Sequence, residues 1–119
     1  MATTRDALDS RAATVAQATL TTSAQTLLAV PATGNCWVIE ALFAIEPSTA
    51  ASPETVTFTK TGDDTTALFT SLPCSPGSGF VIPCGLSGLR LPVNCGLTVI
   101  GGTGGLSCIA CVIAKQSKA

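Results

Sequence analysis

The sequence predicts an all-β protein, an antiparallel β-sandwich, and three observations support this prediction. Threonine is very common, with 18 copies among 119 residues, and it favours the half-buried surface of a pleated sheet. Short apolar segments alternate with clusters of glycine, proline, serine and asparagine, which are typical turn residues. At 55–60 threonine alternates with other residues, so that Val56 and Phe58 face away from three threonines. Short strands at this spacing favour a sandwich, and we expect a jelly-roll-like one.

The turn clusters divide the chain into nine expected strands. The strands are expected near 14–20, 24–30, 36–46, 54–61, 66–72, 78–83, 87–92, 95–101 and 106–115. The first two are uncharged and rich in threonine, alanine and leucine, and the third ends at Pro47. The fourth ends at Gly62, and the fifth and sixth flank a turn rich in glycine and serine at 75–79. The last two flank the glycine loop 101–105.

Two of these strands are apolar on both faces. In the run 36–45, Trp37 and its odd-numbered neighbours form one face, and the even-numbered residues form the other, interrupted only by Glu40. In the last run, Ala110 and Val112 lie on one side, and Ile109, Cys111 and Ile113 lie on the other. One face of an antiparallel sheet usually meets water, so a second apolar face predicts another covering surface. In a chain this short, we expect that surface to belong to another subunit.

The composition supports this expectation and excludes several classes of protein. The length suits one domain, charged residues make up only 11%, and the mean hydropathy is +0.51. A net charge of −1 with no basic patch gives no electrostatic basis for nucleic-acid binding. No stretch of about 20 residues is continuously apolar, so we expect no membrane span. Residues 1–20 lack the apolar core of a signal peptide, so we expect the chain to remain in a cytoplasm.

The beginning of the chain is expected to be an arm that contacts a neighbouring subunit or a shell. Residues 1–13 hold four of the thirteen charged side chains and cannot form a core of their own. An extended arm of about 20 residues would reach up to roughly 65 Å, far enough to cross onto an adjacent subunit. We therefore divide the chain into an arm at 1–20 and a single sandwich domain at 21–119.

No catalytic, cofactor or metal site is expected. The sequence has no histidine and no tyrosine, and no cysteine has a cluster of positive charge beside it to activate the thiol. Of the six cysteines, only Cys108 and Cys111 have the close spacing of a zinc pair, and on a strand they would face opposite sides. Buried free thiols are favoured, and disulfides remain open. The adjacent Asp63 and Asp64 suit a solvated turn better than a cation site. We therefore expect no enzyme activity.

One carboxylate is harder to explain, because Glu40 interrupts an otherwise apolar strand. If it is buried, its charge needs a partner. Arg90 is the single arginine after residue 11, so an ion pair between Glu40 and Arg90, within or between subunits, is one hypothesis.

The order of segments resembles a known family. The segments are 21–28, 37–43, 55–60, 80–83 and 96–99, followed by a glycine loop and a closing apolar strand. In this order the chain resembles the small β-sandwich decoration or cement proteins on the capsids of tailed bacteriophages. The resemblance covers roughly 20–115, and the six cysteines are not part of its pattern. It implies a homo-oligomer, most often a trimer, that is clamped onto the major capsid protein, and it transfers no catalytic residues.

We therefore expect a virion structural protein, on the capsid surface and assembled in the host cytoplasm, that stabilises a phage head. The candidate interface residues are Arg5, Leu8, Arg11, Val15, Val38, Leu42, Ile109 and Ile113. One alternative is another virion component, such as a head spike, neck or tail protein. A carbohydrate-binding module is a second, although Trp37 lies in the most apolar run. A third is a pilus-type subunit in which 14–20 serves as a donor strand.

Overall fold

The chain folds into a β-sandwich of two antiparallel sheets, described here from a computed structural model. The structure describes residues 13–46, 54–75, 77–84, 88–102 and 108–118, and within these ranges all helical or extended structure is strand. The strands are β1 (Thr14–Thr19), β2 (Gln25–Leu28), β3 (Asn35–Ile45), β4 (Glu54–Gly62), β5 (Ala67–Cys74), β6 (Gly79–Pro83), β7 (Leu89–Arg90), β8 (Cys95–Gly101) and β9 (Ile109–Lys118). Each lies at the place that the sequence predicted. The jelly-roll designation stays a prediction.

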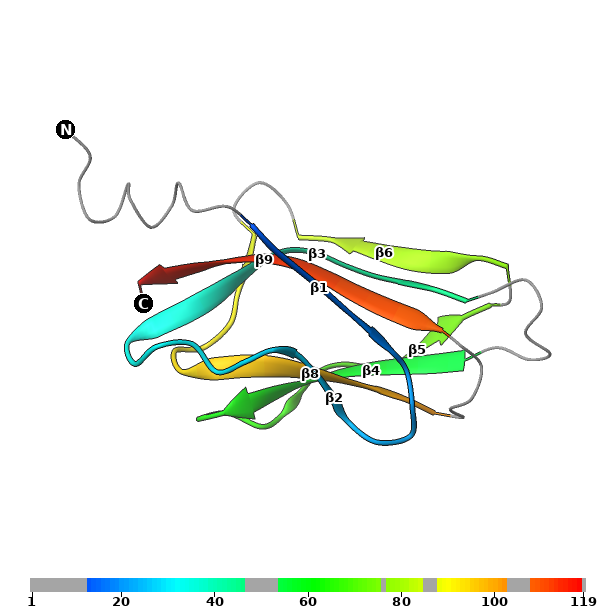
Figure 1. Cartoon of the computed structure of the whole chain (residues 1–119), viewed down its shortest axis with the longest axis horizontal. Coiled ribbons are helices and arrows are strands. Elements are labelled where there is room, and N and C mark those ends of the chain that lie inside the picture. Colours follow the sequence, from blue (N-terminus) through cyan, green and yellow to red (C-terminus); the bar gives the residue numbers. More distant parts are fainter. Residues whose placement is uncertain (1–12, 47–53, 76, 85–87, 103–107, 119) are drawn as a thin grey trace.

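The strands divide into two layers, which lie one above the other in Figure 1. Sheet A has the order β1-β9-β3-β6, and the short β7 also pairs with β3. Sheet B has the order β2-β8-β4-β5. The chain changes sheets repeatedly, so most neighbouring strands are distant in the sequence. This arrangement lets both sheets contribute their inner faces to one core.

The core lies between the sheets and is almost entirely aliphatic and aromatic. From sheet A it receives Ile39, Leu42 and Val112, each fully buried, and from sheet B it receives Val56 and Phe58. The Phe58 ring meets Phe80 edge to face, with centroids 6.5 Å apart. Burying a side chain of this size contributes roughly 1.5–3 kcal/mol. The alternation expected at 55–60 is confirmed, because Val56 and Phe58 enter the core and the threonines beside them do not.

Strand β3 contains a β-bulge that the sequence analysis did not predict. Ile39 pairs with Ala114 and Ala41 pairs with Ile113, so Glu40 is an extra residue without a partner on β9. The bulge reverses the alternation: Ile39 before it and Leu42 after it both point into the core. The expectation that Leu42 lies on an outer interface face is therefore wrong. Parity alone assigned Leu42 to the face opposite Ile39, and one inserted residue overturns that assignment.

Two separate strands pair with the same edge of β3, one on each side of the bulge. β6 pairs with Ala41–Ile45, and β7 pairs with Val38 and Ile39. At the bulge itself, the Cys84 amide donates to the carbonyl of Glu40 over 3.2 Å. The backbone irregularity is thus matched by a change of partner strand.

The sandwich begins earlier than the expected division at residue 20. β1 pairs with β9 over its whole length, from Thr14 opposite Ala114 to Thr19 opposite Ile109. Residues 14–19, which the division assigned to an arm, are thus an edge strand of sheet A. In the described chain this segment already completes its own sheet, so it does not behave as the free donor strand of a pilus-type subunit. The remainder of the expected arm, 1–12, lies outside the described residues.

Candidate functional site

The outer face of sheet A is apolar across all four of its principal strands. The strand pairing aligns outward residues in rows: Val15, Ile113, Ala41 and Pro83 form one row. A second row contains Cys111, Phe43 and Val81, and a third contains Ile109 and Ile45. We call these nine side chains the apolar face. Gln17 and Thr19 border it on β1, where they pair with Cys111 and Ile109.

Several side chains of the apolar face are freely accessible to solvent. Val15 and Val81 are 68% and 67% exposed and lie on the two edge strands, β1 and β6. Ile45 is 59% exposed on β3. Strands lie about 4.8 Å apart and successive rows about 6.8 Å apart, so the nine positions of this face cover roughly 300 Å². A patch of this size is comparable with the largest apolar patch on a typical monomer, which is often functional.

The outer face of sheet B has a different composition. Thr26, Thr98 and Thr59 form a row across β2, β8 and β4, with Ala67 at its end on β5. Thr55, Thr57 and Thr61 continue outward along β4, and all three are partly exposed. Hydroxyl groups therefore predominate on the outer face of sheet B, although Ile100 lies beside Thr57 and Pro73 lies beside Thr55. The contrast singles out sheet A as the candidate interface.

The candidate interface residues named from the sequence divide into three groups. Val15, Ile109 and Ile113 belong to the apolar face. Val38 is half-buried and lies beyond this face, paired with Lys115 and Arg90. Arg5, Leu8 and Arg11 lie outside the described residues. Phe43 and Val81 also belong to this face, although the sequence pattern did not predict them as interface residues. The outward position of Phe43 follows only once the bulge in β3 is known. That of Val81 follows only once the pairing of β6 with β3 is known.

The end of sheet A near the C-terminus is charged, but not as expected. Glu40 is exposed, and its carboxylate lies 3.5 Å from the ammonium of Lys115. The guanidinium of Arg90 instead donates from Nη1 to the Cys36 sulfur over 2.9 Å and to the Lys118 carbonyl over 3.2 Å. The hypothesis of a buried Glu40–Arg90 ion pair within one subunit is therefore wrong, and a pair between subunits stays a prediction. The bulge turns Glu40 outward, where water solvates it and a partner is not obligatory.

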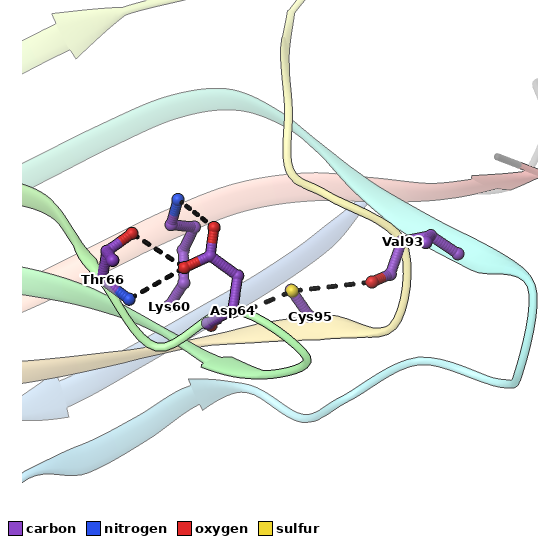
Figure 2. A network of polar contacts seen from close by, with 5 residues as sticks. All are labelled: Lys60, Asp64, Thr66, Val93 and Cys95. Carbon is purple, nitrogen blue, oxygen red and sulfur yellow. Dashed lines mark hydrogen bonds and ion pairs between the residues drawn. The ribbon is translucent and has the colours of Figure 1, made fainter.

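The adjacent aspartates form a turn with its own partners, and Figure 2 shows those of Asp64. Asp64 accepts from the Lys60 ammonium over 2.8 Å and from both the amide and hydroxyl of Thr66 over 2.9 and 2.8 Å. The hydrogen bond from Lys60 is the main cause that lowers the pKa of Asp64 to about 2. Asp63 accepts from the Asn94 amide over 3.2 Å. These bonds fix the connection between β4 and β5, as expected of a solvated turn.

The cysteines are mostly interior. All six are free thiols in this structure, and all except Cys84, which is half-buried, are buried. Cys108 faces the core while Cys111 faces outward, so the two lie on opposite sides as expected. Among the residues that the structure describes, no three cysteine, aspartate or glutamate side chains are arranged to hold a metal ion.

The single tryptophan is also interior. Trp37 is 6% exposed, and its indole N–H donates to the carbonyl of Ala29 over 2.8 Å. Its ring is therefore covered by the fold and offers no open surface on which a sugar could stack.

Two buried carboxylates escaped the sequence analysis. Glu46 and Glu54 are 1% and 0% exposed, and one oxygen of Glu46 accepts from the Glu54 amide over 3.0 Å. Glu54 occupies an inward position of β4 before Val56, and Glu46, which directly follows β3, continues the inward series of Leu42 and Ala44. The alternation in β4 could have predicted that Glu54 is buried. The inward position of Glu46 follows only once the bulge in β3 is known.

Comparison of the chain with protein-family models, with curated proteins and with solved structures found no match. In the described part of the chain, no helix has the length and apolar character needed to cross a membrane.

Proposed function

We propose that this chain is a structural assembly protein: a virion component that decorates a phage capsid as a homo-oligomer, most simply a trimer. In this proposal it is made in the host cytoplasm and binds the major capsid protein at the capsid surface. It has no catalytic role. Each subunit would bridge neighbouring shell subunits, and a ligand that binds only the assembled shell stabilises that state by mass action.

The apolar face of sheet A is the observation that carries the proposal. Removing roughly 300 Å² of apolar surface from water corresponds to about 7 kcal/mol, before the cost of association is subtracted. That cost is about 4–15 kcal/mol, so this face suffices for association only together with its surroundings. A standard interface uses about 800 Å² per partner, more than twice this area. The apolar face is therefore expected to form the centre of a larger contact that also includes polar residues such as Gln17 and Thr19.

The polar outer face of sheet B supports the same proposal from the other side. A decoration protein needs one surface that binds the assembly and another that stays in water. Thr26, Thr59 and Thr98 supply hydroxyl groups across three strands on the second surface.

The oligomeric state is the first test. We expect light scattering after size-exclusion chromatography to give a trimer for the wild type and a monomer for Val81→Asp. A carboxylate at this place would lose its water when the face is covered. Val30→Asp is the matched control, because Val30 is 48% exposed and lies outside sheet A. A monomeric wild type, or equal mass loss in both variants, would contradict the use of the apolar face.

The role in a capsid needs a separate test. Particles from the source, banded on a density gradient, would be analysed by quantitative mass spectrometry. We expect this chain at a stoichiometry near that of the major shell protein, or at a simple fraction of it. A few copies per particle would favour a spike, neck or tail component. Absence from particles would overturn the virion assignment.

A further inference from the structure

Two cysteines meet in the interior, one from each sheet. Cys74 is the last residue of β5 in sheet B, and Cys108 immediately precedes β9 in sheet A. Each is 1% exposed, and their sulfur atoms lie 3.8 Å apart. The contact therefore joins the two layers of the sandwich across 34 positions of sequence.

This pair differs from the other four cysteines. In the described residues, the Cys36 sulfur contacts Arg90, and the Cys84, Cys95 and Cys111 sulfurs contact oxygen atoms. The contact between Cys74 and Cys108 is the one described contact between two sulfurs.

The backbone holds both cysteines in place. Cys74 pairs with Glu54 in the ladder of β4 and β5, and the Cys108 carbonyl accepts from the Leu20 amide over 2.8 Å. A disulfide requires sulfur atoms about 2.05 Å apart, so the two must approach by roughly 1.8 Å. Rotation of the two side chains is the movement available for that approach, since both backbones are tied into the sandwich.

We propose that Cys74 and Cys108 form an intrachain disulfide, which fastens sheet A to sheet B when the chain folds in the presence of a low-molecular-weight disulfide. One cysteine thiolate attacks the oxidant, forms a mixed disulfide and releases one small thiol. The second thiolate attacks the protein sulfur of that mixed disulfide and releases the second small thiol. The two protein thiols lose two electrons and two protons, and the oxidant is reduced to two thiols.

The surroundings determine when this bond forms. Burial raises the pKa of Cys108 to about 12, and the neighbouring Cys74 thiol adds to that effect. Burial also raises the pKa of Cys74; the hydrogen bond from Cys108 opposes this, and the Glu46 and Glu54 carboxylates add to the increase. Since the thiolate is the attacking species, the folded reduced chain oxidises slowly. The bond forms while the chain is folding, and afterwards the same burial keeps reductants away from it.

The test compares two refolding conditions for the full chain. Denatured, reduced protein is refolded with dithiothreitol or with a mixture of reduced and oxidised glutathione, and free thiols are then alkylated under denaturing conditions. Trypsin cleaves after Lys60, Arg90 and Lys115, which places Cys74 in peptide 61–90 and Cys108 in peptide 91–115. We expect these two peptides to be linked only after refolding in glutathione, with fragmentation spectra assigning the bond to Cys74 and Cys108.

Two further measurements make the proposal specific. The oxidised protein is expected to melt at least about 5 °C higher than the reduced protein, because the bond closes a long loop. The folded reduced protein is expected to acquire the bond at least about 100-fold more slowly than the refolding chain. Cys111→Ala, on the outer face, is the matched control that keeps the linked peptides, whereas Cys74→Ala loses them.

The wild-type peptide map decides the outcome even where Cys74→Ala fails to fold. Six alkylated cysteines after refolding in glutathione, or a bond to Cys84, Cys95 or Cys111 instead, would overturn the proposal. Both results are independent of the oligomeric state and of any capsid.

Discussion

The two outer faces of this sandwich are built from strands of similar length but from different side chains. Across sheet A, valine, isoleucine and phenylalanine follow one another from β1 to β6. Across sheet B, one row consists of Thr26, Thr98 and Thr59, and further threonines lie along β4. Threonine keeps the β-branched shape that suits a strand while it offers water a hydroxyl group. Strand formation therefore accounts for the threonines on the outer face of sheet B. The outer face of sheet A carries more apolar surface than folding requires.

The largest effect is expected when the inner and outer sides of sheet A are compared at two adjacent residues. Leu42→Ala opens a cavity in the core and should lower the free energy of unfolding by about 2–5 kcal/mol. Phe43→Ala changes the apolar face and should lower the free energy of unfolding of the isolated subunit by less than half as much. Chemical denaturation of both variants checks this. Equal losses would mean that the bulge does not place these two side chains on opposite sides.

The next effect would follow if sheet B were made to look like sheet A. Thr26 and Thr59 flank Thr98 in one row, and neither side chain has a hydrogen bond in the described structure. The double variant Thr26→Val/Thr59→Val should change unfolding by less than about 1 kcal/mol. It should nevertheless create a second adhesive face and shift the sedimentation profile to species larger than the wild-type oligomer. An unchanged sedimentation profile would show that additional apolar surface alone does not cause assembly.

A smaller effect is expected at the charged end of sheet A. The Glu40–Lys115 ion pair is exposed on both sides, with 43% and 38% of the two side chains accessible. Glu40→Gln should therefore cost no more than about 0.5 kcal/mol, measured by thermal unfolding at low and at high salt. A loss several times greater would indicate that Glu40 is covered in the oligomer.

The smallest effect concerns the turn at the end of sheet B. The pKa of Asp64 is lowered from 3.8 to about 2, so its ionised form is favoured by folding. Its contribution to stability is present above pH 3.8 and is lost as the pH falls toward 2. Asp64→Asn should remove this part of the acid dependence while leaving the rest of the profile in place. Denaturation curves between pH 2 and 5 would measure it, and an unchanged slope would contradict it.

The positions of the strands could be predicted from the sequence, whereas their faces and neighbours could not. Turn residues and the alternation of threonine are local signals, so they locate β4 and its neighbours well. The bulge at Glu40 has no comparable local signal, because both sides of β3 are apolar and either phase looks acceptable. Leu42 was therefore assigned to the wrong face, and Val81 was overlooked because the pairing of β6 with β3 depends on contacts distant in sequence.

The two ends of the described chain leave the sandwich at the same end. Thr14 lies opposite Ala114, and Lys118 lies a few residues further along the same strand, β9. A short linker could therefore join the ends, and new termini could be opened between β8 and β9 at the opposite end. Such a circular permutant would keep every strand pair. A second protein fused to its new terminus would project from the other end of the molecule. Comparing the assembly of fusions at the two ends would reveal which end of the subunit stays accessible in an assembled particle.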